Sequence, residues 1–143
     1  EFVRADDKTG LALVRVPGKQ FAFINVSDHF TGGAVHCTGF PTVSIFSPTP
    51  ESIVGRSNTL KPGDTGNWFL ALPSNPRLSG APVTTADGML VGVAMAQRDS
   101  SPAQIPAVRL DAIKAFVAGD LPKGIGSKTA LPYVLMLSAT VAK

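Results

Sequence analysis

Glycine and proline interrupt this chain so often that no long regular element fits between them. The 143 residues include 14 glycines and 12 prolines, and both residue types break helices and strand interiors. The runs between them are short and rich in β-branched and aromatic residues. Eight such runs occur, at 10–16, 21–26, 34–40, 42–47, 52–56, 67–72, 89–96 and 133–137. Short strands at close spacing, with turn residues between them, predict an antiparallel β-barrel or sandwich.

One segment departs from this pattern and predicts a helix. Apolar side chains recur at helical spacing in AVRLDAIKAFVAG, residues 107–119, and Gly119 can end a helix there. A chain of 143 residues has the size of a single domain and can bury a hydrophobic core. We therefore expect a mostly β domain with one helix.

The balance of charge and hydropathy excludes several function classes. The 13 basic and 10 acidic residues give a formal charge of +3. They are scattered rather than clustered, so nucleic-acid binding has no support. Hydrophobic residues make up 44% and charged residues 16% of the chain, which excludes a disordered chain and favours contact with a partner. No apolar stretch reaches the ~20 residues of a membrane span.

The stretch RLSGAPVTTADGMLVGV, residues 77–93, places a serine in a bend before a predicted hairpin. Its order is a bend, a strand, a two-residue Asp-Gly turn and a second strand. Gly80 has no Cβ, so the backbone can approach another group closely there. On this pattern alone Ser79 is a turn residue.

The same stretch resembles the hairpin that carries the nucleophile in trypsin-like serine proteases, in particular those of the HtrA (Do-like) group. In that group the segment runs approximately Gly-Asn-Ser-Gly-Gly-Pro-Leu-Val, followed by a turn with glycine and an apolar strand. Three further segments are similar to family motifs in the same order, namely DDKTGLALVRV (6–16), TGGAVHCTGFP (31–41) and AQIPAVRLDAIKAFV (103–117). Together the matches cover about residues 1–118.

The resemblance implies an all-β fold that corresponds to the C-terminal half of the family's double barrel. We expect a six-stranded antiparallel barrel with one helix after it, one residual strand before it and an added strand at the end. The barrel, the preceding strand and the helix would occupy residues 1–118, and residues 119–143 would form a tail with the extra strand. No cofactor is implied.

The resemblance places Ser79 at the position of the family's nucleophile and Gly10 at the position of its aspartate. A serine hydroxyl needs a histidine to take its proton and an aspartate to orient that histidine. Gly10 has no carboxyl, and the nearby Asp6 and Asp7 are shifted along the chain. The family's histidine belongs to a barrel half that would precede residue 1, so the catalytic set is incomplete.

The oxyanion loop of the family also differs in this chain. The resemblance assigns it to Arg77, Leu78 and Ser79. Such a loop directs two backbone N–H groups at one developing charge. Arg77 stands where the family usually has glycine, which disfavours the unusual backbone dihedrals of these loops. These departures favour a domain without catalytic activity.

Two functions from different classes follow from the resemblance. The first is a degenerate protease-like domain that is not an enzyme and that binds a protein or peptide or acts as a scaffold. The alternative is the C-terminal half of an active serine endopeptidase whose histidine-bearing barrel is missing from this chain. The resemblance also implies a periplasmic or membrane-tethered parent protein, because HtrA relatives commonly work outside the bacterial cytoplasm.

A metal site has little support in the sequence. His29, His36 and Cys37 are potential ligands without a fourth and without a recognised spacing. If residues 34–40 form a strand, His36 and Cys37 point to opposite faces of it. We therefore predict no metal, and a metal-binding protease relic ranks below the two functions above.

The sequence GDTG at 63–66 copies the Gly-Asp-Ser-Gly of the trypsins. Asn67 and Trp68 follow it where Gly-Pro is expected, so the segment predicts a turn rather than a nucleophile.

The tail contains a last apolar run at 131–141, which predicts a strand with apolar residues on both faces. Such a strand must be covered, because an exposed apolar edge invites aggregation. Either it pairs with an exposed edge of the same barrel, or it pairs with a second chain and forms a homo-oligomer.

Overall fold

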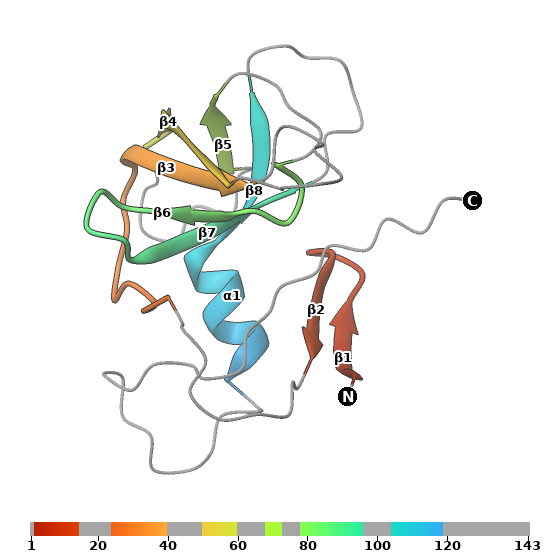
Figure 1. Cartoon of the computed structure of the whole chain (residues 1–143). Coiled ribbons are helices and arrows are strands. Elements are labelled where there is room, and N and C mark those ends of the chain that lie inside the picture. The colour runs from red at the N-terminus through yellow and green to blue at the C-terminus, as the bar shows by residue number, and fades with distance from the viewer. Residues whose placement is uncertain are drawn as a thin grey trace.

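Six antiparallel strands form a closed barrel in the computed structural model of the chain, which describes residues 2–14, 24–39, 50–59, 68–72, 78–95 and 104–118. The barrel strands are β3 (Gly33–Gly39), β4 (Glu51–Ser57), β5 (Trp68–Ala71), β6 (Pro82–Thr84), β7 (Leu90–Ala94) and β8 (Ile105–Arg109). Figure 1 shows them gathered above a single helix, α1 (Leu110–Val117). The predicted six-stranded antiparallel barrel with a following helix is confirmed.

The order of the strands around the barrel is β3-β4-β5-β8-β7-β6. Three consecutive strands, β3 to β5, are followed by a fourth, β6, that returns to lie beside β3, which is a Greek key. The strands β6, β7 and β8 then continue as a meander, and β8 closes the barrel on β5. Closure gives each of the six strands a partner on both sides, which limits the exposed edges that cause aggregation.

Side chains alternate between the interior and the outer surface along the barrel strands. In β3, Val35 and Cys37 are fully buried, whereas His36 between them is only half-buried. His36 and Cys37 therefore point to opposite faces, as predicted. The buried interior is apolar and consists of Val35, Cys37, Trp68, Leu70, Leu72, Leu78, Ala81, Val83, Val91, Ala94, Ile105 and Ala107.

Trp68 is the largest side chain of this interior and is 2% exposed. Its ring meets Phe30 edge-on, with ring centroids 5.9 Å apart and an interplanar angle of 74°. On another side it lies against the backbone of Gly92 in β7, where a Cβ would overlap Cζ3 of the indole. The absence of a side chain at Gly92 thus creates the space that the tryptophan fills.

A separate two-stranded sheet precedes the barrel, formed by β1 (Phe2–Asp6) and β2 (Leu11–Val14). The sequence predicted one strand here, and the structure has two. The difference arises in the turn, where Gly10 adopts φ +68° and donates its N–H to the carbonyl of Asp6 at 2.8 Å. This turn reverses the chain, so that β1 pairs antiparallel with β2.

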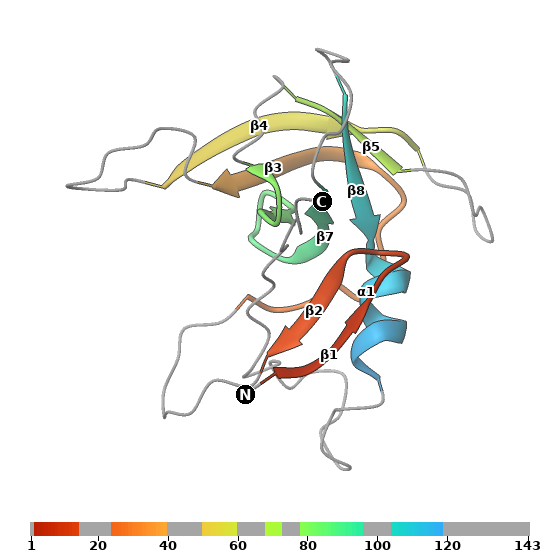
Figure 2. The same cartoon turned by 90° about the vertical axis from the view of Figure 1, so that its right-hand side faces the viewer.

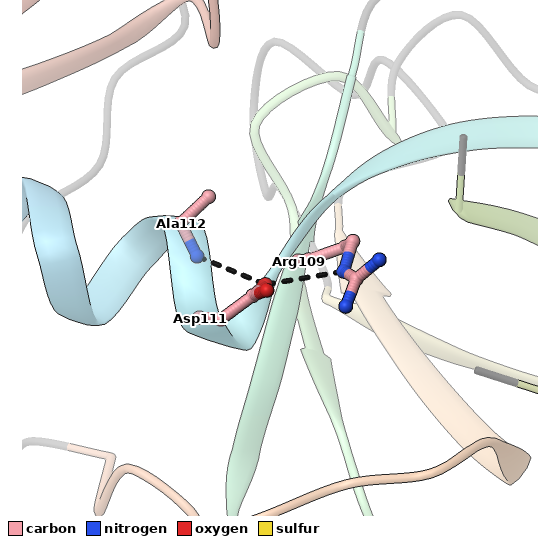
Figure 3. Close-up of polar contacts among 3 residues, drawn as sticks. All are labelled: Arg109, Asp111 and Ala112. Atoms are coloured by element: carbon pink, nitrogen blue, oxygen red, sulfur yellow. Dashed lines mark hydrogen bonds and ion pairs between the residues drawn. The ribbon is translucent and has the colours of Figure 1, made fainter. Parts of the chain in front are cut away.

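The helix α1 follows β8 without an intervening loop. It is shorter than the predicted helix over 107–119, because residues up to Arg109 pair with the neighbouring strands β5 and β7. Figure 3 shows the junction, where the carboxylate of Asp111 accepts hydrogen bonds from Ala112 N at 3.0 Å and from Arg109 Nε at 3.1 Å. The acidic side chain in the first turn also complements the helix dipole.

The hairpin and the helix pack together on the outer wall of the barrel. A second apolar cluster joins them, made of Leu11 from β2, Val93 from β7, Val108 from β8 and Ile113 from α1. In Figure 2 the hairpin lies in front of α1 and below the barrel strands. Because β7 contributes to both clusters, all five of its residues are buried.

Several predictions fall outside the described residues. They are the strands at 42–47 and 133–137, the turn at 63–66, Arg77 and the tail 119–143. Of the predicted strand 21–26, the described part forms only an isolated bridge between Val26 and Leu90. In the part of the chain that the structure describes, no helix is long and apolar enough to cross a membrane.

Candidate functional site

Ser79 lies in a tight turn at the entrance to β6. The turn is closed by a hydrogen bond of 2.9 Å from Ala81 N to the carbonyl of Leu78, and Gly80 takes φ +79°, as the third residue of a type II turn does. The side chain of Leu78 is fully buried in the barrel interior. Ser79 itself is half-buried, so the predicted bend is present and presents this serine at the barrel surface.

Backbone hydrogen bonds fix the Ser79 turn to β7, the strand that pairs with β6. Gly80 N donates to the carbonyl of Ala94 at 2.8 Å, and Ala94 N donates to the carbonyl of Ala81 at 2.9 Å. The position of Ser79 therefore follows from the pairing of β6 with β7, and the backbone on both sides of it is held by the barrel.

The turn between β6 and β7 differs in detail from the predicted two-residue loop. Thr85 N donates to the carbonyl of Met89 at 2.9 Å, and Gly88 N donates to the carbonyl of Thr85 at 3.0 Å. Gly88 takes φ +82°. The loop therefore has three residues, 86–88, in which a β-turn is followed by a left-handed glycine. The prediction that the Asp87-Gly88 pair turns the chain is correct. Gly88, however, is the left-handed residue that follows the two central residues of the β-turn.

Gly10, at the position assigned to the family's aspartate, lies in the exposed turn of the β1–β2 hairpin. No atom lies within 4 Å of the place where its Cβ would be, so a side chain has room there. Its positive φ is the feature that favours glycine. This position offers only backbone groups and cannot orient an imidazole.

Asp6 directly precedes this turn, and both oxygens of its carboxylate accept hydrogen bonds from residues of the turn. Its Oδ2 accepts a hydrogen bond of 2.7 Å from Thr9 Oγ1, and its Oδ1 accepts one of 3.1 Å from Lys8 N. These bonds, first that of Thr9 and then that of Lys8, lower the pKa of Asp6 below its usual 3.8. Asp6 therefore acts as a cap of the hairpin turn. Asp7 lies exposed in the same turn.

Both histidines of the chain are among the described residues, and the hydrogen bonds recorded for them involve other serines. Nδ1 of His36 lies 3.5 Å from Oγ of Ser52, on the outer face of the barrel where β3 pairs with β4. His29 is exposed, and its main-chain carbonyl accepts a hydrogen bond of 2.8 Å from Ser27 Oγ.

Cys37 and the acidic side chains do not assemble a metal site within the described ranges. No three histidine, cysteine, aspartate or glutamate side chains gather there in a way that could hold an ion. Burial raises the pKa of the Cys37 thiol from 9.0 to about 11, so this sulfur is a neutral core atom at pH 7.

The buried indole N–H of Trp68 could not be predicted from the sequence. Nε1 of Trp68 is buried and finds no hydrogen-bond acceptor within the described part of the chain. A buried donor of this kind ordinarily has a partner. Trp68 packs in the core, but no pattern in the sequence indicates how its N–H is placed.

No protein-family model matches the chain, and no curated protein is similar to it. The likeness of its motifs to HtrA proteases is therefore a hypothesis about function, which is developed below.

Proposed function

We propose that this chain is a non-catalytic domain of the trypsin-like type, similar to the C-terminal barrel of HtrA proteases, that binds a protein or peptide. The observation that carries the proposal is the contrast around Ser79. This serine is presented by an ordered turn, whereas the imidazole of His36 contacts Ser52 and the position of the family's aspartate is Gly10. A serine hydroxyl becomes a strong nucleophile when a histidine takes its proton and a carboxylate orients that histidine, and here the imidazole of His36 is engaged with Ser52 and Gly10 has no carboxyl.

The architecture supports the same proposal. A closed six-stranded antiparallel barrel followed directly by a helix agrees with the arrangement that the resemblance implies, whereas the two strands before the barrel exceed the one strand that it implies. The match in element order extends to the turn at Ser79, which directly precedes β6. Fold alone does not determine activity, so the functional argument rests on the residues around this turn.

The binding role is argued from the turn itself. Ser79 and Gly80 are half-buried at the barrel surface, and Gly80 lacks the Cβ that would keep another backbone away. An extended peptide can therefore approach the main chain of this turn and gain hydrogen bonds there. The partner that fits is an extended peptide or a protein loop.

Labelling with a fluorophosphonate tests the absence of catalysis. This reagent reacts with a serine only when a base activates its hydroxyl. The full chain and its Ser79→Ala variant are treated in parallel and examined by intact mass, with an active serine protease as the positive control. We expect no adduct on either protein. A Ser79-dependent adduct would instead support the alternative, the C-terminal half of an active serine endopeptidase.

Peptide display on the folded chain tests the binding role. Selected peptides are titrated calorimetrically against the parent chain, against Ser79→Arg, and against Ala86→Arg as a matched control in the exposed β6–β7 turn. Since an arginine at Ser79 fills the approach to the turn, we expect binding to weaken by about tenfold or more, with the control unchanged. Equal binding to all three proteins, or no selected binder, would contradict the role assigned to this turn.

A further inference from the structure

Two sides of the barrel wall differ in what lies on them. The outer side of β7 and β8 packs against the β1–β2 hairpin and α1 through the cluster that contains Val93 and Val108. The strands β3 and β4 lie on the opposite side of the barrel, away from the hairpin and the helix in both views (Figure 1, Figure 2). On this side Val54, in the middle of β4, is 63% exposed. This part of the wall is therefore open to solvent.

Alternation along the paired strands defines the residues of this outer face. Val35, Cys37 and Ile53 pack in or against the barrel interior. The residues that alternate with them along β3 and β4 therefore point outward. Thr84 of β6 joins them, because it lies opposite His36. The outer face, hereafter the Val54 face, consists of Ala34, His36, Ser52, Val54, Arg56 and Thr84.

The strand register places Val54 beside an imidazole and a guanidinium. Val54 lies directly opposite His36 of β3, and the Cβ atoms of such a pair are about 5 Å apart. Arg56 follows Val54 by two residues on the same side of β4, at about 7 Å. Arg56 is exposed, and His36 is half-buried. An accessible apolar side chain is thus flanked by two nitrogen-bearing side chains.

The charge of this face is positive. Arg56 supplies it, and none of the six residues of the Val54 face is acidic. Two carboxylates lie close to the face along the chain, but Glu51 alternates to the other side of β4, and Asp87 accepts a hydrogen bond from Thr85 Oγ1 in the β6–β7 turn. Among the described residues no ion pair involves Arg56. A ligand with a negative charge is therefore complementary to this face.

An extended peptide matches the spacing of Val54 and Arg56. In an extended chain, residues two positions apart point to one side and are about 7 Å apart. A peptide that lies along β4 can therefore place an apolar side chain on Val54 and a carboxylate on Arg56 when one residue separates the two. A guanidinium binds a carboxylate through two parallel hydrogen bonds, which is the strongest pairing available to either group.

We propose that the Val54 face binds an acidic peptide segment of a partner protein, in which one residue separates an apolar side chain from a carboxylate. Val54 contacts the apolar side chain, and Arg56 binds the carboxylate. This face is a different surface from the turn at Ser79, which lies at the entrance to β6. Its role does not depend on the peptide binding proposed for that turn.

Titration of the full chain with two capped peptides tests the proposal. The first, Thr-Leu-Thr-Glu-Thr, carries the apolar side chain and the carboxylate two positions apart, and the second, Thr-Leu-Thr-Lys-Thr, reverses the charge. The amide resonances of the isotope-labelled protein report where each peptide binds. We expect saturable shifts at Val54 and Arg56 with the first peptide at millimolar concentration, and no shifts there with the second.

Two variants separate an effect of this face from an effect of net charge. Arg56→Gln removes the guanidinium from the Val54 face, and Lys8→Gln removes an exposed ammonium group from the β1–β2 turn. Each substitution lowers the net charge by one. The loss of a hydrogen bond between charged groups weakens binding about tenfold or more. We therefore expect the Kd of the first peptide to rise about tenfold in Arg56→Gln and to stay unchanged in Lys8→Gln.

Four other results would overturn the proposal. Equal binding of the two peptides would show that the face does not select a carboxylate. Equal weakening by the two variants would show that net charge, and not Arg56, attracts the peptide. Shifts confined to Ser79 and Gly80 would place the peptide at the Ser79 turn instead. The absence of any shift at millimolar peptide would contradict the role of the Val54 face, while the binding role of the Ser79 turn keeps its own test.

Discussion

The barrel interior buries many more apolar residues than the layer formed by the β1–β2 hairpin and α1. The interior joins residues from five of the six strands with Leu72, Leu78 and Ala81, and includes Trp68 at 2% exposure. Four buried residues join the layer to the barrel, and a cation–π contact of Arg4 with Phe116 joins the hairpin to α1 within the layer. Local stability follows the amount of buried apolar contact. We therefore expect the layer to unfold locally at a lower free energy than the barrel does.

A large loss of stability is expected where a side chain would intrude on the barrel interior. In Gly92→Ala, the new methyl group would overlap the indole of Trp68 and lie 2.8 Å from the carbonyl oxygen of Val108, which is backbone. We expect a loss of about 3 kcal/mol in the free energy of unfolding, because the tryptophan must move within a packed core. Urea unfolding followed by the fluorescence of Trp68 measures it.

The matched control is the same substitution in the layer. Gly10→Ala meets no atom within 4 Å and is opposed only by φ +68°, which costs about 1 kcal/mol. If the two alanine variants lost equal stability, the barrel and the layer would not differ in packing as the structure indicates.

The second prediction compares a leucine of each region. Leu11→Ala removes a contact between the hairpin, the helix and the barrel wall, and Leu70→Ala removes one inside the barrel. Each truncation costs about 2–5 kcal/mol of local packing. For Leu11→Ala we expect amide exchange in β2 to become at least about tenfold faster while exchange in β3 is unchanged. For Leu70→Ala we expect faster exchange throughout the barrel. A uniform response to both variants would show that hairpin and barrel unfold as one unit.

Four of the barrel strands could be predicted because their pattern is local, whereas residues 107–109 of β8 were predicted to be helical. The strands β3, β4, β5 and β7 fall on apolar runs bounded by turn residues, and alternation along β3 predicted the opposite directions of His36 and Cys37. The strand β1 could not be predicted in the same way. Its sequence FVRAD has no clear alternation, and its pairing depends on the Asp6–Gly10 turn, in which a carboxylate caps the chain and a glycine reverses it.

The candidate site was predictable in its local geometry and not in its contacts. The bend at Ser79 follows from the small Ser-Gly pair before a strand. Its anchoring to Ala94 and the contact of His36 with Ser52 depend on the register of paired strands. Register is set by closure of the whole barrel, so no periodicity within one strand reveals which serine a given histidine meets.

The third prediction concerns the ionisable group of the barrel interior. Burial raises the pKa of Cys37 from 9.0 to about 11, so the folded state favours the neutral thiol. Its contribution to stability is complete below pH 9 and is lost as the pH rises towards 11. We expect slow reaction of the native thiol with a maleimide at pH 7 and fast reaction in denaturant. We also expect a decline in the urea midpoint above pH 9 that is smaller in Cys37→Ala. A native thiol that reacts as fast as free cysteine would contradict its burial.

The smallest effect is expected at Asp6, an ionisable group of the layer, where stability changes with pH in the opposite direction. Hydrogen bonds from Thr9 and Lys8 lower its pKa below 3.8, so they stabilise the hairpin turn above that pH and are lost as the pH falls through the lowered value. The amide resonances of Lys8 and Gly10 should therefore titrate with a midpoint below 3.8, and Asp6→Asn should abolish this transition. A midpoint at 3.8 or above would mean that the bonds of the Asp6 carboxylate do not persist in solution. The hairpin would then be held by the pairing of β1 with β2 and by its contacts with the helix and the barrel wall, and Leu11→Ala should loosen it further.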